Sequence, residues 1–222
     1  MADIRAIVFD FDGVLANSEP LHLLSYQAVL DELGIALDRD EYYTHLLGFD
    51  DVMAFKTISQ RRGERWSEAK IAGILERKTV IFDDIIASRA SSDVLYPETV
   101  PCVRRLAETM PLGIASGALR HEIAAILRRA DLEDCFRFIV AAGETAASKP
   151  APDPYRRAAE LHGVPPGQCV AIEDSRWGIE SAKGAGLRCV GITQTYPAAG
   201  LPGADAIIDS LDEFTVDLLT RL

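Results

Sequence analysis

The 222-residue sequence predicts an α/β fold in which a parallel sheet core carries a small helical cap domain inserted after the first strand. Three observations predict this class. A short apolar strand opens the chain, a stretch from about residue 20 to about residue 86 has helical patterns without a convincing strand, and strand and helix patterns alternate from residue 91 onward. We therefore expect a core of residues 1–16 and 90–222 and a cap domain of residues 17–89.

The first strand is expected from Ile4 to Phe9, where an apolar run ends abruptly in two aspartates. The insert that follows has apolar residues at helical spacing in several segments. Its first helix is expected around Leu21 to Leu30, with an end near Gly34. Three or so further helices are expected over Asp40 to Leu47, Asp51 to Arg61 and Ser67 to Ile86.

The rest of the chain alternates between apolar runs of strand length and amphipathic patterns, which is typical of parallel strands joined by crossover helices. Strands are expected over Leu112 to Ala115, Phe138 to Ala141, Cys169 to Ile172, Cys189 to Ile192 and Ala206 to Ile208. Helices are expected over Pro97 to Glu108, Leu119 to Ala130, Pro154 to His162 and Trp177 to Gly184. Together with the first strand, these elements can form one core.

The acidic composition of the chain narrows the classes of partner. The formal net charge is −11 and the basic residues are scattered, so the field repels polyanions and argues against a nucleic-acid partner. No apolar run suits a membrane span, and the first residues do not resemble an export signal. The four cysteines form no Cys-x-x-Cys pair, which argues against a disulfide framework or a zinc site. We expect a cytoplasmic protein.

Polar residues follow four of the expected strands, three times directly and once within the loop that comes after the strand. Asp10 and Asp12 follow the first strand, and the others are Ser116 with Gly117, Lys149, and Glu173 with Asp174. Each of them alone is also an ordinary turn, cap or loop residue. Sites on parallel sheets collect at the carboxyl ends of the strands, so we expect this set to meet at one edge.

The set contains the groups that phosphoryl transfer needs. Asp10 would attack phosphorus, and Asp12 would protonate the leaving oxygen and later activate water. Lys149 and Ser116 would bind the phosphoryl oxygens. In so acidic a chain an anionic substrate also needs a cation, and Mg²⁺ would be held by Asp10, the Asp12 carbonyl group, Asp174 and water.

The segments that carry this chemistry are Asp10 to Leu15, Ser116-Gly117, Ser148 to Tyr155, Glu173 to Ser175 and Ala204 to Phe214. In order and spacing they resemble the haloacid dehalogenase superfamily, in the branch similar to β-phosphoglucomutase and related sugar-phosphate phosphatases. The resemblance implies a Rossmann-like core, a four-helix cap after the first strand, and Mg²⁺. It further implies Asp10 as nucleophile and Asp12 as acid and base. The phosphate ligands would be Ser116 and Lys149, and Glu173 and Asp174 would lie at the metal.

Within this resemblance, the presence of Asp12 favours an enzyme that cleaves phosphate esters or anhydrides. Dehalogenases and phosphonatases of the superfamily have no Asp at this position. At the start of the cap, Ser18 and His22 match positions that the mutase uses, and Arg120 could bind a substrate oxygen. The mutase has basic residues around its cap glycine, whereas Leu47 to Asp51 supplies acidic and apolar ones. Two anions would be poorly held there, which favours a monophosphatase.

The sequence therefore predicts a Mg²⁺-dependent phosphatase that hydrolyses a small phosphorylated metabolite, such as a sugar phosphate, through an aspartyl phosphate. A β-phosphoglucomutase-type isomerase and an inorganic pyrophosphatase stay open as alternatives. A phosphoryl-binding regulatory protein without turnover is disfavoured by the intact pair of aspartates, Asp10 and Asp12. We expect no nucleic acid or membrane as partner, and a monomer or a weak homo-oligomer.

Overall fold

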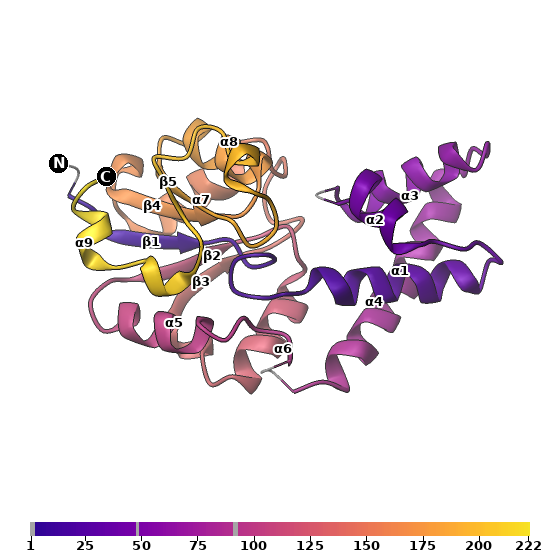
Figure 1. The fold of residues 1–222 in the computed structure, drawn as a ribbon, viewed down its shortest axis with the longest axis horizontal. Coiled ribbons are helices and arrows are strands. Elements are labelled where there is room, and N and C mark those ends of the chain that lie inside the picture. The colour runs from indigo at the N-terminus through magenta and orange to yellow at the C-terminus, as the bar shows by residue number, and fades with distance from the viewer. Residues whose placement is uncertain (1–2, 48, 91–92) are drawn as a thin grey trace. The chain divides into compact units, whose positions relative to one another are not determined.

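The computed structural model describes residues 3–47, 49–90 and 93–222. The chain divides into two compact units, one of Met1–Asn17 with Ala90–Leu222 and one of Ser18–Arg89. We call the first the core unit and the second the helical unit, and Figure 1 shows the elements of each. None of the helices in the described residues has the length and apolar character needed to cross a membrane.

The core unit is built on one parallel sheet with the strand order β3-β2-β1-β4-β5-β6. The six strands are β1 Ala6–Phe9, β2 Leu112–Ala115, β3 Phe136–Val140, β4 Cys169–Glu173, β5 Arg188–Ile192 and β6 Ala206–Ile208. The helices of this unit are α5 Thr99–Ala107, α6 Arg120–Arg129, α7 Asp153–His162, α8 Arg176–Gly184 and α9 Val216–Leu219. Short 3-10 turns lie at Glu133–Cys135, Pro166–Gln168, Ala198–Gly200 and Leu211–Glu213. The predicted α/β class with a parallel sheet is confirmed.

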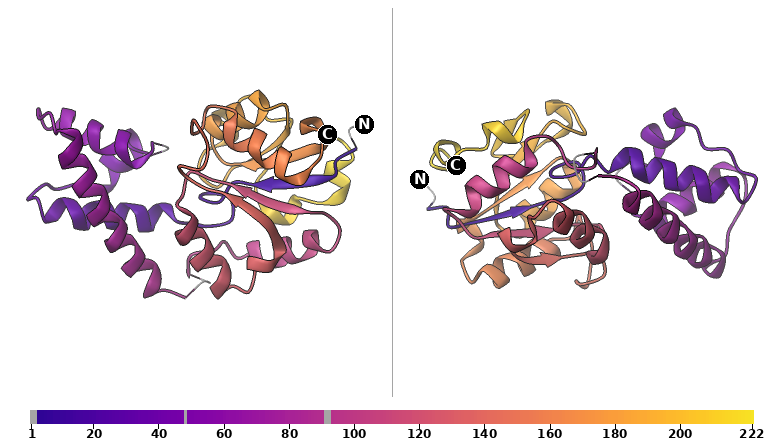
Figure 2. Two further views of the ribbon diagram at one scale, coloured as in Figure 1. Left: turned by 180° about the vertical axis from the view of Figure 1, so that it is seen from behind. Right: turned by 90° about the horizontal axis from the view of Figure 1, so that it is seen from below.

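Strand β1 lies in the middle of the sheet, and all four of its residues are buried. Helices cover both faces: α7 and α8 lie on one face, and α5 and α6 on the other (Figures 1 and 2). A strand buried on two faces reads as a continuous apolar run, which is why this segment was recognisable without an alternating pattern. Ile7 pairs with Leu112 of β2 and with Val170 of β4, so the residues that follow these strands emerge at one edge.

The observed bounds differ from the expected ones by a residue or two at most elements. One difference matters for the site, because β4 continues through Glu173 and ends one residue later than expected. Glu173 is fully buried. Its carboxylate lies against Gly178 of α8, where a Cβ atom would come within 1.8 Å of the Glu173 carboxylate.

The described part of the helical unit folds into four helices, α1 Glu19–Asp31, α2 Arg39–His45, α3 Asp51–Arg61 and α4 Glu68–Ala87. The last three begin at residues whose side-chain oxygens accept a hydrogen bond from a backbone N–H in the first turn: Asp38, Asp50 and Ser67. The apolar faces of the four helices form a core within the helical unit, which includes Tyr26, Leu30, Tyr42, Phe55 and Ile58. The expectation of a helical insert after the first strand is confirmed.

His162, in the last turn of α7, makes the core unit sensitive to acid. Its ring is buried, packs edge-on against Phe138 with centroids 4.6 Å apart, and has Nε2 3.2 Å from the Ile7 carbonyl oxygen. Nδ1 has no hydrogen-bond partner within the described residues. Burial lowers the pKa of His162, nearby Arg137 lowers it further, and the Ile7 carbonyl only partly opposes them.

We expect the contribution of His162 to the unfolding free energy to fall as pH decreases below about 6.5, the usual pKa of histidine, because the unfolded chain then binds a proton that the folded chain resists. This contribution to the slope is at most about 1.4 kcal/mol per pH unit. In urea denaturation between pH 5 and pH 7.5, His162→Gln should gain stability relative to the wild-type chain as pH decreases. The matched variant His45→Gln, at an exposed residue, should keep the wild-type profile. Equal slopes in both variants would contradict the assignment.

Candidate active site

The site begins where β1 ends, in a tight loop that carries both aspartates. Asp10 is buried, and its N–H donates to the Ile172 carbonyl oxygen of β4 at 3.0 Å. The loop then folds on itself: the N–H groups of Leu15 and Ala16 both donate to the Phe11 carbonyl oxygen at 2.9 Å. The N–H of Gly13 donates to the Ala16 carbonyl oxygen at 2.8 Å. Asp12 is therefore held in a closed turn directly beyond the strand.

Gly13 is required at this turn for two reasons. Its φ of 75° lies in the left-handed region that favours glycine. A Cβ atom on it would lie 1.8 Å from Asp174 Oδ2 and 2.5 Å from Thr195 Oγ1. The glycine thus lets the side chains that follow β4 and β5 approach the Asp12 turn closely.

A buried charge cluster joins three of the predicted residues. Lys149 Nζ donates to Asp10 Oδ1 at 2.7 Å and to Glu173 Oε1 at 2.6 Å. The hydroxyl of Tyr155, on α7, donates to the same Glu173 oxygen at 2.6 Å, and the Lys149 ammonium lies 4.9 Å from the Tyr155 ring centroid. The side chains are little exposed, at 14% for Lys149, 10% for Asp10 and 1% for Glu173. Glu173 and Tyr155 therefore fix the position of the lysine beside Asp10.

The electrostatics of this cluster show an excess of negative charge. Burial is the main cause that raises the pKa of Asp10 to about 7; Lys149 opposes it, and Glu173 and Asp12 raise the pKa further. For Lys149, burial alone would lower the pKa, but Asp10 and Glu173 outweigh it and raise the pKa above its ordinary value. One ammonium group does not balance the carboxylates around it.

The same edge offers ligands for a metal ion. Oxygen atoms of Asp10, Glu173 and Asp174 lie within 4.8 Å of one another, and all three residues are buried. An all-oxygen set of this kind suits a hard divalent cation such as Mg²⁺. The excess of buried negative charge described above is a second reason why a cation fits here.

Ser116 and Gly117 follow β2 at this edge of the sheet. Phe9, the residue before Asp10, pairs with Ile114 of β2 and with Ile172 of β4. Ser116 and Asp174 each lie two residues beyond these partners, so they follow their strands at the same edge as Asp10. Ser116 is buried, and its Oγ accepts a hydrogen bond from the Ala118 N–H at 3.0 Å.

Arg120 is engaged elsewhere in the core unit. Its guanidinium donates to both carboxylate oxygens of Glu144, at 2.6 and 2.8 Å, and to the Ile139 carbonyl oxygen at 2.6 Å. A role in substrate binding would require this bidentate pair to open.

Ser18 and His22 belong to the helical unit. Ser18 directly precedes α1 and is buried. The His22 ring stacks on Phe82 with centroids 4.3 Å apart, and its Nδ1 lies 3.2 Å from Lys78 Nζ. Of the expected cap motif Leu47 to Asp51, Gly48 lies outside the described residues.

Lys78 is a buried cation that the sequence analysis missed. It is 2% exposed, and its Nζ donates to both carboxylate oxygens of Asp51 at 2.8 Å. The Tyr26 hydroxyl donates to Asp51 Oδ1 at 2.6 Å. A signal was present in the sequence, because Lys78 interrupts the apolar stripe of α4 formed by Ile71, Ile74, Phe82 and Ile86.

Loss of Asp51 should destabilise the helical unit by leaving Lys78 buried without a counter-charge. Burial opposes ionisation of Asp51, but Lys78 and the Tyr26 hydroxyl outweigh it and lower its pKa. Breaking a fully buried pair costs about 3–5 kcal/mol. The Asp51 side chain is 38% exposed, so we expect Asp51→Ala to lower the unfolding free energy by about 2 kcal/mol in urea denaturation.

Asp40 provides the matched control for this prediction. It also lies in the first turn of a helix, α2, but it is exposed. Asp40→Ala should therefore lower the unfolding free energy by well under about 1 kcal/mol, which is the stabilisation that an acidic side chain gives at the start of a helix. The double variant Asp51→Ala/Lys78→Met should regain most of the stability. Equal losses for Asp51→Ala and Asp40→Ala would contradict the account.

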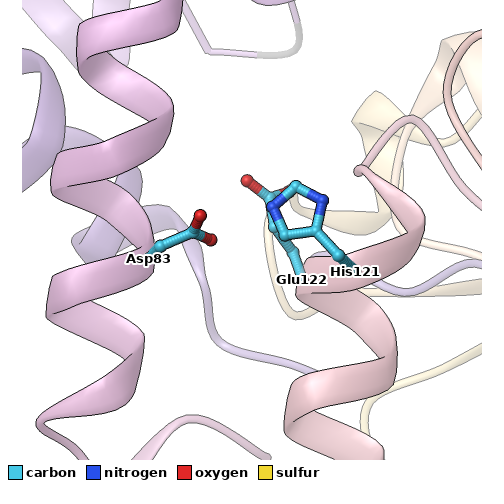
Figure 3. Close-up of side chains that lie close together, drawn as sticks. All are labelled: Asp83, His121 and Glu122. Carbon is cyan, nitrogen blue, oxygen red and sulfur yellow. The ribbon is translucent and has the colours of Figure 1, made fainter.

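Figure 3 draws Asp83, His121 and Glu122, which come from different units of the chain. Asp83 belongs to α4 of the helical unit, whereas His121 and Glu122 lie in the first turn of α6 in the core unit (Figure 3). Glu122 has a local role there, because its Oε2 accepts a hydrogen bond from the Leu119 N–H at 3.1 Å.

Comparison with known proteins identifies the family. A family model described as haloacid dehalogenase-like hydrolase matches residues 4–186. The chain belongs to this family. The match spans β1, the helical unit and the core elements through α8, so the resemblance carried by the motifs is confirmed, and with it the fold.

Individual relatives agree with this membership. The chain is 30% identical to β-phosphoglucomutase of Bacillus subtilis over 223 residues, which cover 97% of this chain and 94% of that protein. It is 34% identical to protein CbbY of Rhodobacter capsulatus over 194 residues, 85% of each chain. The crystal structure of CbbY from Rhodobacter sphaeroides in complex with phosphate matches with a TM-score of 0.84 and 30% identity, over 95% of this chain and 96% of that one. A mutant of the same protein has been crystallised in complex with xylulose-(1,5)bisphosphate.

Proposed function

We propose that this chain is a Mg²⁺-dependent phosphatase that hydrolyses a small phosphorylated metabolite, such as a sugar phosphate, through an aspartyl-phosphate intermediate. The observation that carries the proposal is the buried Asp10 carboxylate, bonded to Lys149 at 2.7 Å beside an acidic cluster able to hold a metal. The CbbY structures support a phosphorylated sugar as the general substrate class, because that protein was crystallised with phosphate and its mutant with xylulose-(1,5)bisphosphate.

In the first half of the reaction, an Asp10 oxygen attacks phosphorus and forms the aspartyl phosphate as the bond to the leaving oxygen breaks. Asp12 donates its proton to that leaving oxygen, so the product departs as a neutral alcohol. In the second half, Asp12 takes a proton from water as the water oxygen attacks phosphorus. Inorganic phosphate is released, and Asp10 is regenerated as a carboxylate.

The surrounding residues position and neutralise the reacting groups. Lys149 binds phosphoryl oxygens and is itself held by Glu173 and Tyr155, while Ser116 with Gly117 contacts the phosphoryl group from the end of β2. Mg²⁺, held by Asp10, the Asp12 carbonyl group and Asp174 with Glu173 adjacent, would supply the positive charge that lets an anionic substrate approach the carboxylate.

The helical unit would act as the cap and select the substrate. A monophosphate is favoured, because Lys78, the buried cation of this unit, already binds both oxygens of Asp51 and is not open to a second phosphate group. The assignment of Ser18, His22 and Arg120 to substrate binding stays a prediction.

Release of inorganic phosphate from a panel of phosphorylated metabolites, with Mg²⁺ and with a chelator, tests the proposal. We expect metal-dependent release from one or more monophosphates and weaker release from bisphosphates. No metal-dependent release from any compound would refute the phosphatase. An isomerised sugar phosphate without net phosphate release would instead establish a mutase, and selective hydrolysis of pyrophosphate would establish an inorganic pyrophosphatase.

A further inference from the structure

The end of β5 contributes residues to the catalytic edge that neither the motifs nor the proposed mechanism use. Thr193, Gln194 and Thr195 follow β5, whose Gly191 pairs with Glu173 of β4. They therefore emerge beside Asp174, on the side of β4 away from β1. Thr195 lies close to the Asp12 turn, because its Oγ1 would be 2.5 Å from a Cβ atom on Gly13.

Gln194 makes the direct contact with that turn. The end of its side chain faces two backbone carbonyl oxygens, so the amide is oriented with its nitrogen toward them. In this orientation Nε2 donates to the Gly13 oxygen at 2.8 Å and to the Val14 oxygen at 3.1 Å. Both N–H bonds of one amide group are used, which only a glutamine or asparagine side chain can do without carrying a charge.

These two bonds add to the hydrogen bonding of the turn from outside. Inside it, the Phe11 and Ala16 oxygens accept from N–H groups of the turn itself. The Leu15 oxygen accepts from the Tyr96 N–H at 3.1 Å and the Thr99 hydroxyl at 2.7 Å. Gln194 holds the stretch that directly follows Asp12, including the left-handed Gly13.

Gln194 is itself anchored by its neighbour. The Thr193 N–H donates to the Ile208 carbonyl oxygen of β6 at 3.0 Å, and its hydroxyl donates to Asp209 Oδ1 at 2.6 Å. The segment after β5 is thus tied to the end of β6, and a rigid backbone carries the amide to the turn. A side chain fixed at both ends can position a catalytic loop.

We propose that Gln194 is a positioning residue that clamps the turn after Asp12 and thereby sets the place of the Asp12 carboxyl and carbonyl groups. Loss of the clamp would leave two carbonyl oxygens of a buried turn without their donor. Asp12 would then sample positions from which it transfers a proton poorly. The proposal predicts lower turnover with little change in apparent substrate affinity, because Gln194 contacts the turn and not the substrate.

The test uses Gln194→Met, which keeps the length but removes the donor, and Gln194→Glu, which also places a carboxylate against the two carbonyl oxygens. The matched control is Gln27→Met, which removes a single amide bond to the Leu37 carbonyl oxygen in the helical unit. Hydrogen exchange of peptides that cover residues 11–16, Mg²⁺ affinity by calorimetry, kcat, KM and the unfolding midpoint are measured on the full chain.

We expect Gln194→Met to speed exchange in residues 11–16 and to lower kcat, each by about tenfold, with KM within about twofold. Mg²⁺ binding should weaken, Gln194→Glu should show larger effects, and Gln27→Met should show none of them. Unchanged exchange and kcat in a folded Gln194→Met would overturn the proposal. So would a fall in stability with exchange faster throughout the core unit, since that indicates a structural role only.

The kcat arm rests on the proposed phosphatase, whereas the exchange and metal-binding arms do not. If the wild-type chain releases no phosphate from any substrate, the proposed function fails. Local exchange in residues 11–16 then still decides whether Gln194 clamps the turn.

Discussion

Asp10→Asn is expected to lower metal-dependent phosphate release by at least about 10⁴-fold, because an amide cannot form the aspartyl phosphate. The comparison is kcat/KM on the best substrate of the panel. Asp134→Asn, at an exposed aspartate of the same unit, serves as the matched control and should keep wild-type activity. Residual activity above about 1% in Asp10→Asn would contradict the role of Asp10 as nucleophile.

The same variant also allows a test that needs no substrate, which is the pH dependence of its unfolding free energy. The pKa of Asp10 is raised to about 7 in the folded state, above its ordinary value of 3.8. Between these values the folded Asp10 binds more protons than the unfolded one, so its contribution to stability falls as pH rises through this window. In metal-free buffer we expect the unfolding free energy of Asp10→Asn, relative to that of the wild-type chain, to rise between pH 5 and pH 7, because the variant lacks this contribution. An identical pH profile in both proteins would show that Asp10 does not make it.

Lys149→Met is expected to have the largest effect on stability, a loss of about 3–5 kcal/mol in urea denaturation. The variant leaves Asp10 and Glu173 buried with no ammonium group between them. Phosphate release should fall as well, because the group that binds the phosphoryl oxygens is gone.

Two further variants separate the structural and catalytic contributions of Lys149. Lys183→Met removes the more exposed ion pair to Asp205, at 2.6 Å, and should cost about 1 kcal/mol or less. The double variant Lys149→Met/Glu173→Gln removes one of the two uncompensated carboxylates and should regain part of the stability without regaining activity. If it regained activity, Lys149 would act only through folding.

The architecture was predictable because its signals are local. Apolar runs such as Ala6–Phe9 identify buried parallel strands, and helical spacing identifies the insert. The convergence of Asp10, Lys149 and Asp174 followed from a general property of parallel sheets, since residues after neighbouring strands emerge at one edge. The roles assigned to these residues stay predictions until they are tested.

Other features could not be predicted from local signals. Gln194 lies just after β5, and no sequence motif surrounds it. Its contact with Gly13 and Val14 depends on the orientation of its side chain across the edge of the sheet. The ion pair of Lys78 with Asp51 joins residues of two helices, and spacing along one helix marks the lysine but not its partner. The pairing of Arg120 with Glu144 depends on a loop conformation in the same way.

The central position of β1 has a consequence for how the protein is made. Ile7 finds its two neighbours, Leu112 and Val170, more than 100 residues later in the chain. During synthesis the first strand therefore stays unpaired until β2 and β4 have been made. The helices of the insert have their own apolar core and can fold as soon as they emerge. The catalytic edge would be among the last parts to assemble, because it needs Asp10 from the beginning of the chain and Asp174 and Gln194 from near its end.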